Sequence, residues 1–129
     1  MNTKWETFEG RQYRHNARQE PRVSLGAKGT LYLNGKAFEA LERPGAVEML
    51  YDGNRRIIGL KPTDPRRHNA FVVKNHGTGN YKRISAAAFC QHFRLKYQRT
   101  LLFENVDIDN DGVMLLDLGK VIEIGRGAR

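Results

Sequence analysis

Short apolar runs alternate with Gly-containing loops over residues 22–62. The runs "RVSL" and "TLYL" are short and strand-like, and "GAKG" joins them. Ala37, Phe38 and Leu41 then recur at helical spacing behind Asn34, whose side-chain oxygen can cap the first turn of a helix. "AVEMLY" and "RRIIGLK" follow as a strand pair around a D-G dipeptide. The pattern predicts the order β-β-α-β-β.

The same order of elements recurs over residues 70–118. "AFVV" and "YKRI" are strand-like and are joined by the loop "KNHGTGN". Ser85 can cap a helix that carries Phe89 and Phe93 at positions i and i+4. "TLLFENV" and "VMLLDL" then form a strand pair around Asp111-Gly112, after a longer connector than in the first copy.

The two copies align at their helix starts and at their hairpin turns. Asn34-x-x-Ala37-Phe38 corresponds to Ser85-x-x-Ala88-Phe89, and Asp52-Gly53 corresponds to Asp111-Gly112. Two copies are fewer than a solenoid needs, so they suit a closed pseudo-twofold pair. We therefore predict an α+β, β-rich fold with the following organisation: a flexible N-terminal arm at 1–20, a tandem body at 21–118 (repeat one 22–62, repeat two 70–118), and a basic C-terminal tail at 119–129.

Charge is distributed unevenly along the chain. The net charge is +8, and the segment from Gly53 to Arg99 holds eleven Lys or Arg residues and one acid, Asp64. This segment therefore carries +10, and the rest of the chain carries −2. Such asymmetry predicts a surface that meets phosphate groups or an acidic partner, the alternative being a solvated face without a partner.

The order strand, Gly-containing loop, strand, short capped helix and D-G hairpin ending in "IIGLKP" resembles the AbrB/MazE/MraZ superfamily of transition-state regulators and antitoxins. The resemblance covers about Arg22 to Leu118 and is strongest in "KGTLYLNGKAFEAL" and "VEMLYDGNRRIIGLKP". It implies a swapped-hairpin β-barrel of two interlocking ββαββ units, both supplied here by one chain, as in MraZ-like members. It also implies sequence-specific DNA binding.

The family contacts DNA through basic residues just after the loop glycine and on the helix. This chain has Thr30 and Tyr81 after its loops, and apolar or acidic residues at the helix positions. The family's contact residues therefore do not transfer, and DNA binding must rest on the chain's own cations. We predict the following nucleic-acid contacts: Lys28, Arg55, Arg56, Arg66, Arg67, Lys74, Lys82 and Arg83.

The two Gly-containing loops are expected to emerge near each other if the body is pseudo-twofold. Their glycines, Gly26, Gly29, Gly77 and Gly79, would allow phosphates to approach the backbone closely.

The stretch "VDIDNDGVML" contains Asp107, Asp109 and Asp111 followed by Gly112, the opening of an EF-hand calcium loop. Such a loop needs a bidentate Glu at its twelfth position, where this chain has Leu118. We therefore interpret the stretch as a hairpin turn. The four histidines, His15, His68, His76 and His92, form no metal spacing with Cys90, so no metal site or cofactor is predicted.

The single cysteine, Cys90, lies in an apolar helix, so we predict a buried thiol rather than a nucleophile, and no enzyme. One cysteine fits a reducing cytoplasm, and no apolar run reaches the roughly 18 residues of a membrane span. The predicted function is a non-enzymatic DNA-binding protein, a transcriptional regulator or accessory factor. The predicted state is a monomer with an internal pseudo-dimer, or a small homo-oligomer. The alternative is a protein-interaction module, an adaptor or antitoxin-like regulator that binds an acidic protein partner.

Overall fold

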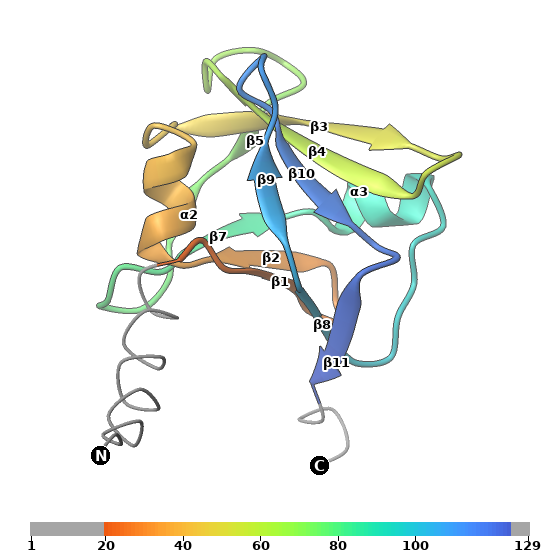
Figure 1. Cartoon of the computed structure of the whole chain (residues 1–129). Helices are drawn as coiled ribbons and strands as arrows, with labels where there is room; N and C mark the ends of the chain where they lie inside the picture. The colour runs from red at the N-terminus through yellow and green to blue at the C-terminus, as the bar shows by residue number, and fades with distance from the viewer. Residues whose placement is uncertain (1–19, 125–129) are drawn as a thin grey trace, which may run out of the picture.

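Two β-sheets and two short helices make up the part of the chain described by the computed structural model, residues 20–124. In the six-stranded sheet the order is β11 (Val121–Ile124), β8 (Thr100–Phe103), β1 (Val23–Leu25), β2 (Thr30–Leu33), β7 (Lys82–Ser85) and β6 (Lys74–Asn75). In the five-stranded sheet the order is β5 (Phe71–Val72), β3 (Ala46–Asp52), β4 (Ile57–Thr63), β10 (Met114–Asp117) and β9 (Val106–Ile108). The helices are α2 (Gly35–Ala40) and α3 (Ala87–His92), which lie towards opposite ends of the molecule (Figure 1). The fold is therefore β-rich, as predicted.

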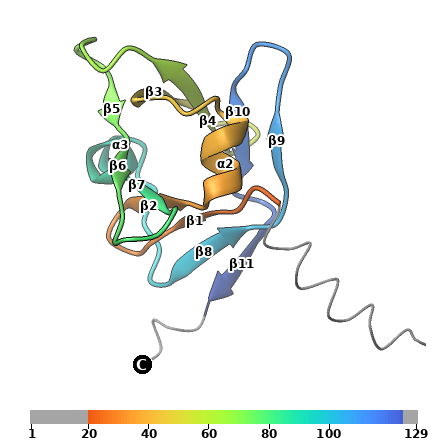
Figure 2. The same ribbon diagram turned by 90° about the vertical axis from the view of Figure 1, so that its left-hand side faces the viewer.

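Both sheets combine strands from the two halves of the chain. β2 pairs with β7 and β4 pairs with β10, while β1 pairs with β8 and β3 pairs with β5, all antiparallel. Three short connections pass directly from one sheet to the other. β5 and β6 are separated by Val73, and β8 and β9 by Glu104–Asn105 (Figure 2). β10 and β11 are separated by residues 118–120. Neither half of the chain can therefore complete a sheet alone. The sheets are not closed, because β11 and β6 are the edges of one and β5 and β9 are the edges of the other.

The core lies between the inner faces of the two sheets. Alternation along β2 and β4 turns Leu31, Leu33, Ile58 and Leu60 inward. The largest fully buried side chains come from both halves: Val23, Leu31, Leu33, Leu41, Val47, Ile58, Leu60, Ile84, Leu101, Met114 and Leu116. Burial of this shared set stabilises the pairing of the halves.

The two helices begin differently. Asn34 caps α2, since its Oδ1 accepts a hydrogen bond of 2.9 Å from the backbone N–H of Ala37. The predicted cap Ser85 is wrong: it lies exposed in β7, and the N-cap of α3 is Ala86, which makes no side-chain bond. The N-caps of α2 and α3, Asn34 and Ala86, are thus 52 residues apart, one more than the sequence alignment proposed.

The aspartates of "VDIDNDGVML" form a hairpin turn between β9 and β10. The Oδ1 atom of Asp109 accepts hydrogen bonds from the backbone N–H groups of Asp111 (2.8 Å) and Val113 (3.0 Å), and Gly112 has φ 82°. Asp52 has the same role before β4, but there Arg56 (φ 57°) rather than Gly53 adopts the left-handed conformation. Within residues 20–124, no group of three or more His, Cys, Asp or Glu side chains is arranged to hold a metal ion.

The predicted terminal segments lie mostly outside the described residues. The N-terminal arm falls on residues 1–19, and the stretch "GRGAR" falls on residues 125–129. The predicted tail at 119–129 nevertheless begins too early, because Val121–Ile124 form β11, paired with β8. None of the helices in the described part has the length and apolar character needed to cross a membrane.

Candidate nucleic-acid interface

The eight cations predicted to contact nucleic acid fall into separate groups on the structure. Lys28 lies in the β1–β2 turn, next to Gly29, which approaches Ala87 of α3. Arg55 and Arg56 lie in the β3–β4 turn, and Arg66 and Arg67 lie between β4 and β5. The remaining three belong to the β6–β7 hairpin: Lys74, Lys82 and Arg83.

Two of the eight already have carboxylate partners. Nε of Arg55 lies 2.9 Å from Oδ2 of Asp52, and Nη2 of Arg66 lies 2.8 Å from Oδ2 of Asp64. The hydrogen bond from each arginine side chain lowers the pKa of the partner aspartate. Among residues 20–124, salt bridges involve none of the other six cations. Arg55 and Arg66 are therefore the least available of the set for phosphate contacts.

The two Gly-containing loops do not emerge together, so that expectation is wrong. β2 and β7 are antiparallel, with Thr30 opposite Ser85 and Leu33 opposite Lys82. Each loop immediately precedes its strand, and the loops therefore lie at opposite ends of the pair, separated by roughly 10 Å of strand at about 3.3 Å per residue. The β1–β2 turn lies next to α3, and the 76–81 loop lies next to α2. Lys28 is thereby separated from the cations of the β6–β7 hairpin.

A row of three polar side chains crosses the outer face of the six-stranded sheet. Leu31 and Leu33 point to the core, so Tyr32 between them points outward, and Arg83 points outward for the same reason beside buried Ile84. The register places Tyr32 opposite Arg83, and Arg83 opposite Lys74. No described element covers this face (Figure 1).

One further side chain extends the row, because the His76 ring lies 4.9 Å from the Tyr32 ring, centroid to centroid. Lys82 lies on the other face of the sheet, because it has the same orientation in β7 as buried Ile84. There its Nζ lies 4.8 Å from the centroid of Phe38 on α2 and donates a 2.6 Å hydrogen bond to Oδ1 of Asn75. We call the outer-face set the β6–β7 surface: Tyr32, Lys74, His76 and Arg83.

The β6–β7 surface combines fixed positive charge with aromatic rings. The chain has no Asp or Glu from Pro65 to Phe103, so no sequence neighbour neutralises its cations. The adjacent loop contains Gly77 and Gly79, and a side chain at either position would meet open space. Such a surface can neutralise phosphates through its cations and stack bases on its rings.

Tyr32 and His76 were missed by the sequence reasoning. The alternation in "TLYL" already places Tyr32 opposite to the two buried leucines and could have identified it. His76 is brought to Tyr32 by the β2–β7–β6 pairing, which no local pattern indicates.

Comparison of the chain with protein-family models, with curated proteins and with solved structures gave no significant match.

Proposed function

We propose that the protein is a non-enzymatic nucleic-acid-binding protein, with DNA as the favoured partner, and that it binds through the β6–β7 surface. The observation that carries the proposal is the row of Lys74, Arg83 and Tyr32 on an uncovered sheet face, with His76 against the tyrosine. Lys and Arg bind phosphates with release of condensed counterions, and the rings offer stacking platforms for exposed bases.

We also propose that the two halves form the interlocked hairpin units of an AbrB-like protein within one chain. In a pseudo-twofold arrangement each strand has a counterpart in the other half of the chain. The pairings β2–β7 and β4–β10 each join a strand to its counterpart. The pairings β1–β8 and β3–β5 join the remaining strands across the two halves in an equivalent way. The helices support the relation: Glu42 and Arg94, 52 residues apart, both have left-handed φ values, 66° and 58°. On this basis the role is a transcriptional regulator or a DNA-associated accessory factor.

A non-enzymatic role is supported by the environment of the one cysteine. Cys90 is buried in the core cluster, and desolvation raises the pKa of its thiol. A raised pKa disfavours the thiolate that a nucleophile requires.

The second candidate function is a protein-interaction module. The outer face of the five-stranded sheet carries an apolar row in which Leu50, Gly59 and Leu115 are neighbours, and Leu50 is 42% exposed. A protein partner on this face would bind with little salt dependence, whereas an acidic protein on the β6–β7 surface would compete with DNA.

The proposal is tested by fluorescence anisotropy with labelled random-sequence single-stranded and duplex DNA over a range of salt concentrations. The pair Lys74→Gln/Arg83→Gln is compared with the matched pair Lys61→Gln/Lys120→Gln, which removes the same charge from exposed positions elsewhere. We expect affinity to fall steeply with salt, and the first pair to weaken binding about tenfold more than the second. Tyr32→Leu should weaken single-strand binding by roughly 1 to 3 kcal/mol if bases stack there.

Equal losses from both pairs would attribute binding to net charge alone and reject the β6–β7 surface. Absence of binding to either DNA at low salt would reject the nucleic-acid function.

A further inference from the structure

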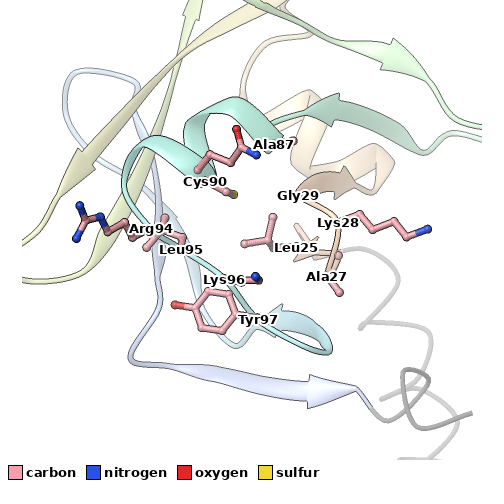
Figure 3. A pocket seen from close by; sticks show the side chains of 12 residues that line it. Leu25, Ala27, Lys28, Gly29, Ala87, Cys90, Arg94, Leu95, Lys96 and Tyr97 are labelled. Carbon is pink, nitrogen blue, oxygen red and sulfur yellow. The ribbon is translucent and has the colours of Figure 1, made fainter.

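A pocket of about 540 Å³ opens between the β1–β2 turn, α3 and the segment 94–97 that follows α3 (Figure 3). Its size is within the range of small-molecule sites, about 300 to 1,000 Å³. The floor is apolar and includes the buried side chains of Leu25, Cys90 and Leu95. From this pocket we propose a binding site for a small organic anion that combines a flat apolar ring system with one acidic group.

Three positive side chains and no carboxylate belong to the residues that line the pocket. Lys28 and Arg94 lie on opposite sides with their charged ends directed away from the hollow, and Lys96 lies between them in the segment after α3 (Figure 3). All three side chains are exposed, and none has a salt-bridge partner among the described residues. An acidic group on a ligand would therefore meet the Lys96 ammonium, and the long exposed side chains of Lys28 and Arg94 can turn towards it, above a floor that favours an apolar body.

One wall of the pocket is held by a contact from another part of the chain. Tyr97 lines the pocket, is half-buried and packs against the core. Its Oη accepts a hydrogen bond of 2.9 Å from Nη2 of Arg56 in the β3–β4 turn. The ring is thereby fixed at the edge of the pocket, where it can contact the flat body of a ligand.

The matching position on α2 differs in both size and charge. At the spacing of 52 residues that relates the helices, Cys90 corresponds to Phe38, and Arg94 corresponds to Glu42. Phe38 occupies its position with a large ring, over which the Lys82 ammonium lies. The small Cys90 leaves space, and Arg94 in place of an acidic residue leaves the rim of that space without a carboxylate. The hollow is thus a property of the α3 side, rather than a consequence of the fold common to both halves.

This site is separate from the β6–β7 surface, because the β1–β2 turn lies at the other end of the β2–β7 pair. The inference therefore goes beyond the proposed nucleic-acid binding, and its failure would leave that proposal intact.

The test uses 2-naphthoate as the probe and 2-naphthalenemethanol as its uncharged counterpart, titrated into the ¹⁵N-labelled full chain and followed by NMR. We expect saturable shifts centred on the amides of Gly26, Gly29 and Lys96, and about tenfold weaker binding of the alcohol, because it lacks the charge that the cations would meet. Shifts centred elsewhere, or equal affinity for both probes, would overturn the proposal.

Two variants locate the binding. Cys90→Phe introduces the residue that α2 has at the matching position, and we expect it to weaken naphthoate binding about tenfold or more by filling the pocket. Lys28→Gln/Lys96→Gln should weaken it to about the affinity of the alcohol, while the matched pair Lys36→Gln/Lys61→Gln should have no effect. The lysine pair decides the outcome if Cys90→Phe does not fold. Unchanged binding in the Lys28/Lys96 variant contradicts the site.

Discussion

The side chain of Asn34 accepts a hydrogen bond of 2.9 Å from the backbone N–H of Arg22, at the start of β1. The same oxygen accepts the N–H of Ala37 in the first turn of α2, and Nδ2 donates to the carbonyl oxygen of Glu20 at 2.8 Å. Asn34 is the one buried polar side chain among the described residues. It therefore connects the entry of β1, the end of β2 and the start of α2 through a single amide.

Replacing Asn34 should destabilise the fold strongly. Asn34→Ala removes a helix cap and leaves a buried N–H without a partner, so we expect the free energy of unfolding to fall by about 2 to 4 kcal/mol. Ser85→Ala is the matched control, because Ser85 is exposed and caps nothing; it should change the value by less than about 0.5 kcal/mol. Urea denaturation measures both. Similar losses of stability in the two variants would contradict the conclusion that Asn34 caps a helix and Ser85 does not.

Replacement of the loop glycines by alanine should lower the free energy of unfolding by different amounts. Gly29 has φ 91°, and a Cβ there would lie 2.7 Å from the Cα of Ala87, so Gly29→Ala should cost about 3 kcal/mol or more through strain and displacement of α3. Gly77 has φ 69° but meets nothing within 4 Å, so Gly77→Ala should cost about 1 kcal/mol. Gly79→Ala should be close to neutral. Thermal unfolding followed by circular dichroism gives the order, and a Gly29 variant as stable as the Gly79 variant would contradict it.

Alkylation of Cys90 should be slow. The thiol is buried and its pKa is raised by desolvation, so at pH 8 the native chain should react with iodoacetamide at least about ten times more slowly than the chain in urea. The rate should rise as the pH is increased above about 8.5, the ordinary pKa of cysteine. Because the chain has one cysteine, intact-mass spectrometry follows the reaction directly. A native rate equal to that in urea would place the thiol at the surface.

Asp52 should remain ionised at unusually low pH. The side-chain hydrogen bond from Arg55 is the main cause of its lowered pKa, and the backbone N–H of Arg55 adds to it. Since the folded pKa lies below the unfolded value, the contribution of this group to stability is present above the unfolded pKa and is lost as the pH falls through the folded pKa. In an NMR carboxyl titration, Arg55→Gln should raise the pKa of Asp52 and leave that of Asp64 unchanged, because Asp64 depends on Arg66. An unchanged Asp52 would reject the contact with Arg55.

Local chemistry explains which parts of the fold the sequence could predict. The strand-like run "TLYL" indicated β2, and Asp111-Gly112 indicated the β9–β10 turn. Asn34 was recognisable as a cap because the cap bond spans only three residues. Each of these features depends on neighbours a few positions away.

The errors concern contacts between distant segments. Ser85 is of a residue type that often caps helices, but its pairing with Thr30 keeps it in β7. Val121–Ile124 was assigned to a tail because its partner, β8, could not be identified from the pattern alone. The candidate site has the same origin, since Lys74, Arg83 and Tyr32 become neighbours through the order of β6, β7 and β2.

The mixing of both halves in each sheet has a consequence for synthesis on the ribosome. β1 lies between β2 and β8, and β4 lies between β3 and β10. When residues 22–62 have left the exit tunnel, two hairpins can form, but both edges of each are unpaired and an apolar face is uncovered. The partner of β3 is translated first, at β5, followed by β7 for β2 and β8 for β1, and β4 receives its partner only when Met114–Asp117 has been translated. The nascent chain therefore exposes unpaired edges for most of its translation, and strand edges of this kind are prone to aggregate or to bind chaperones.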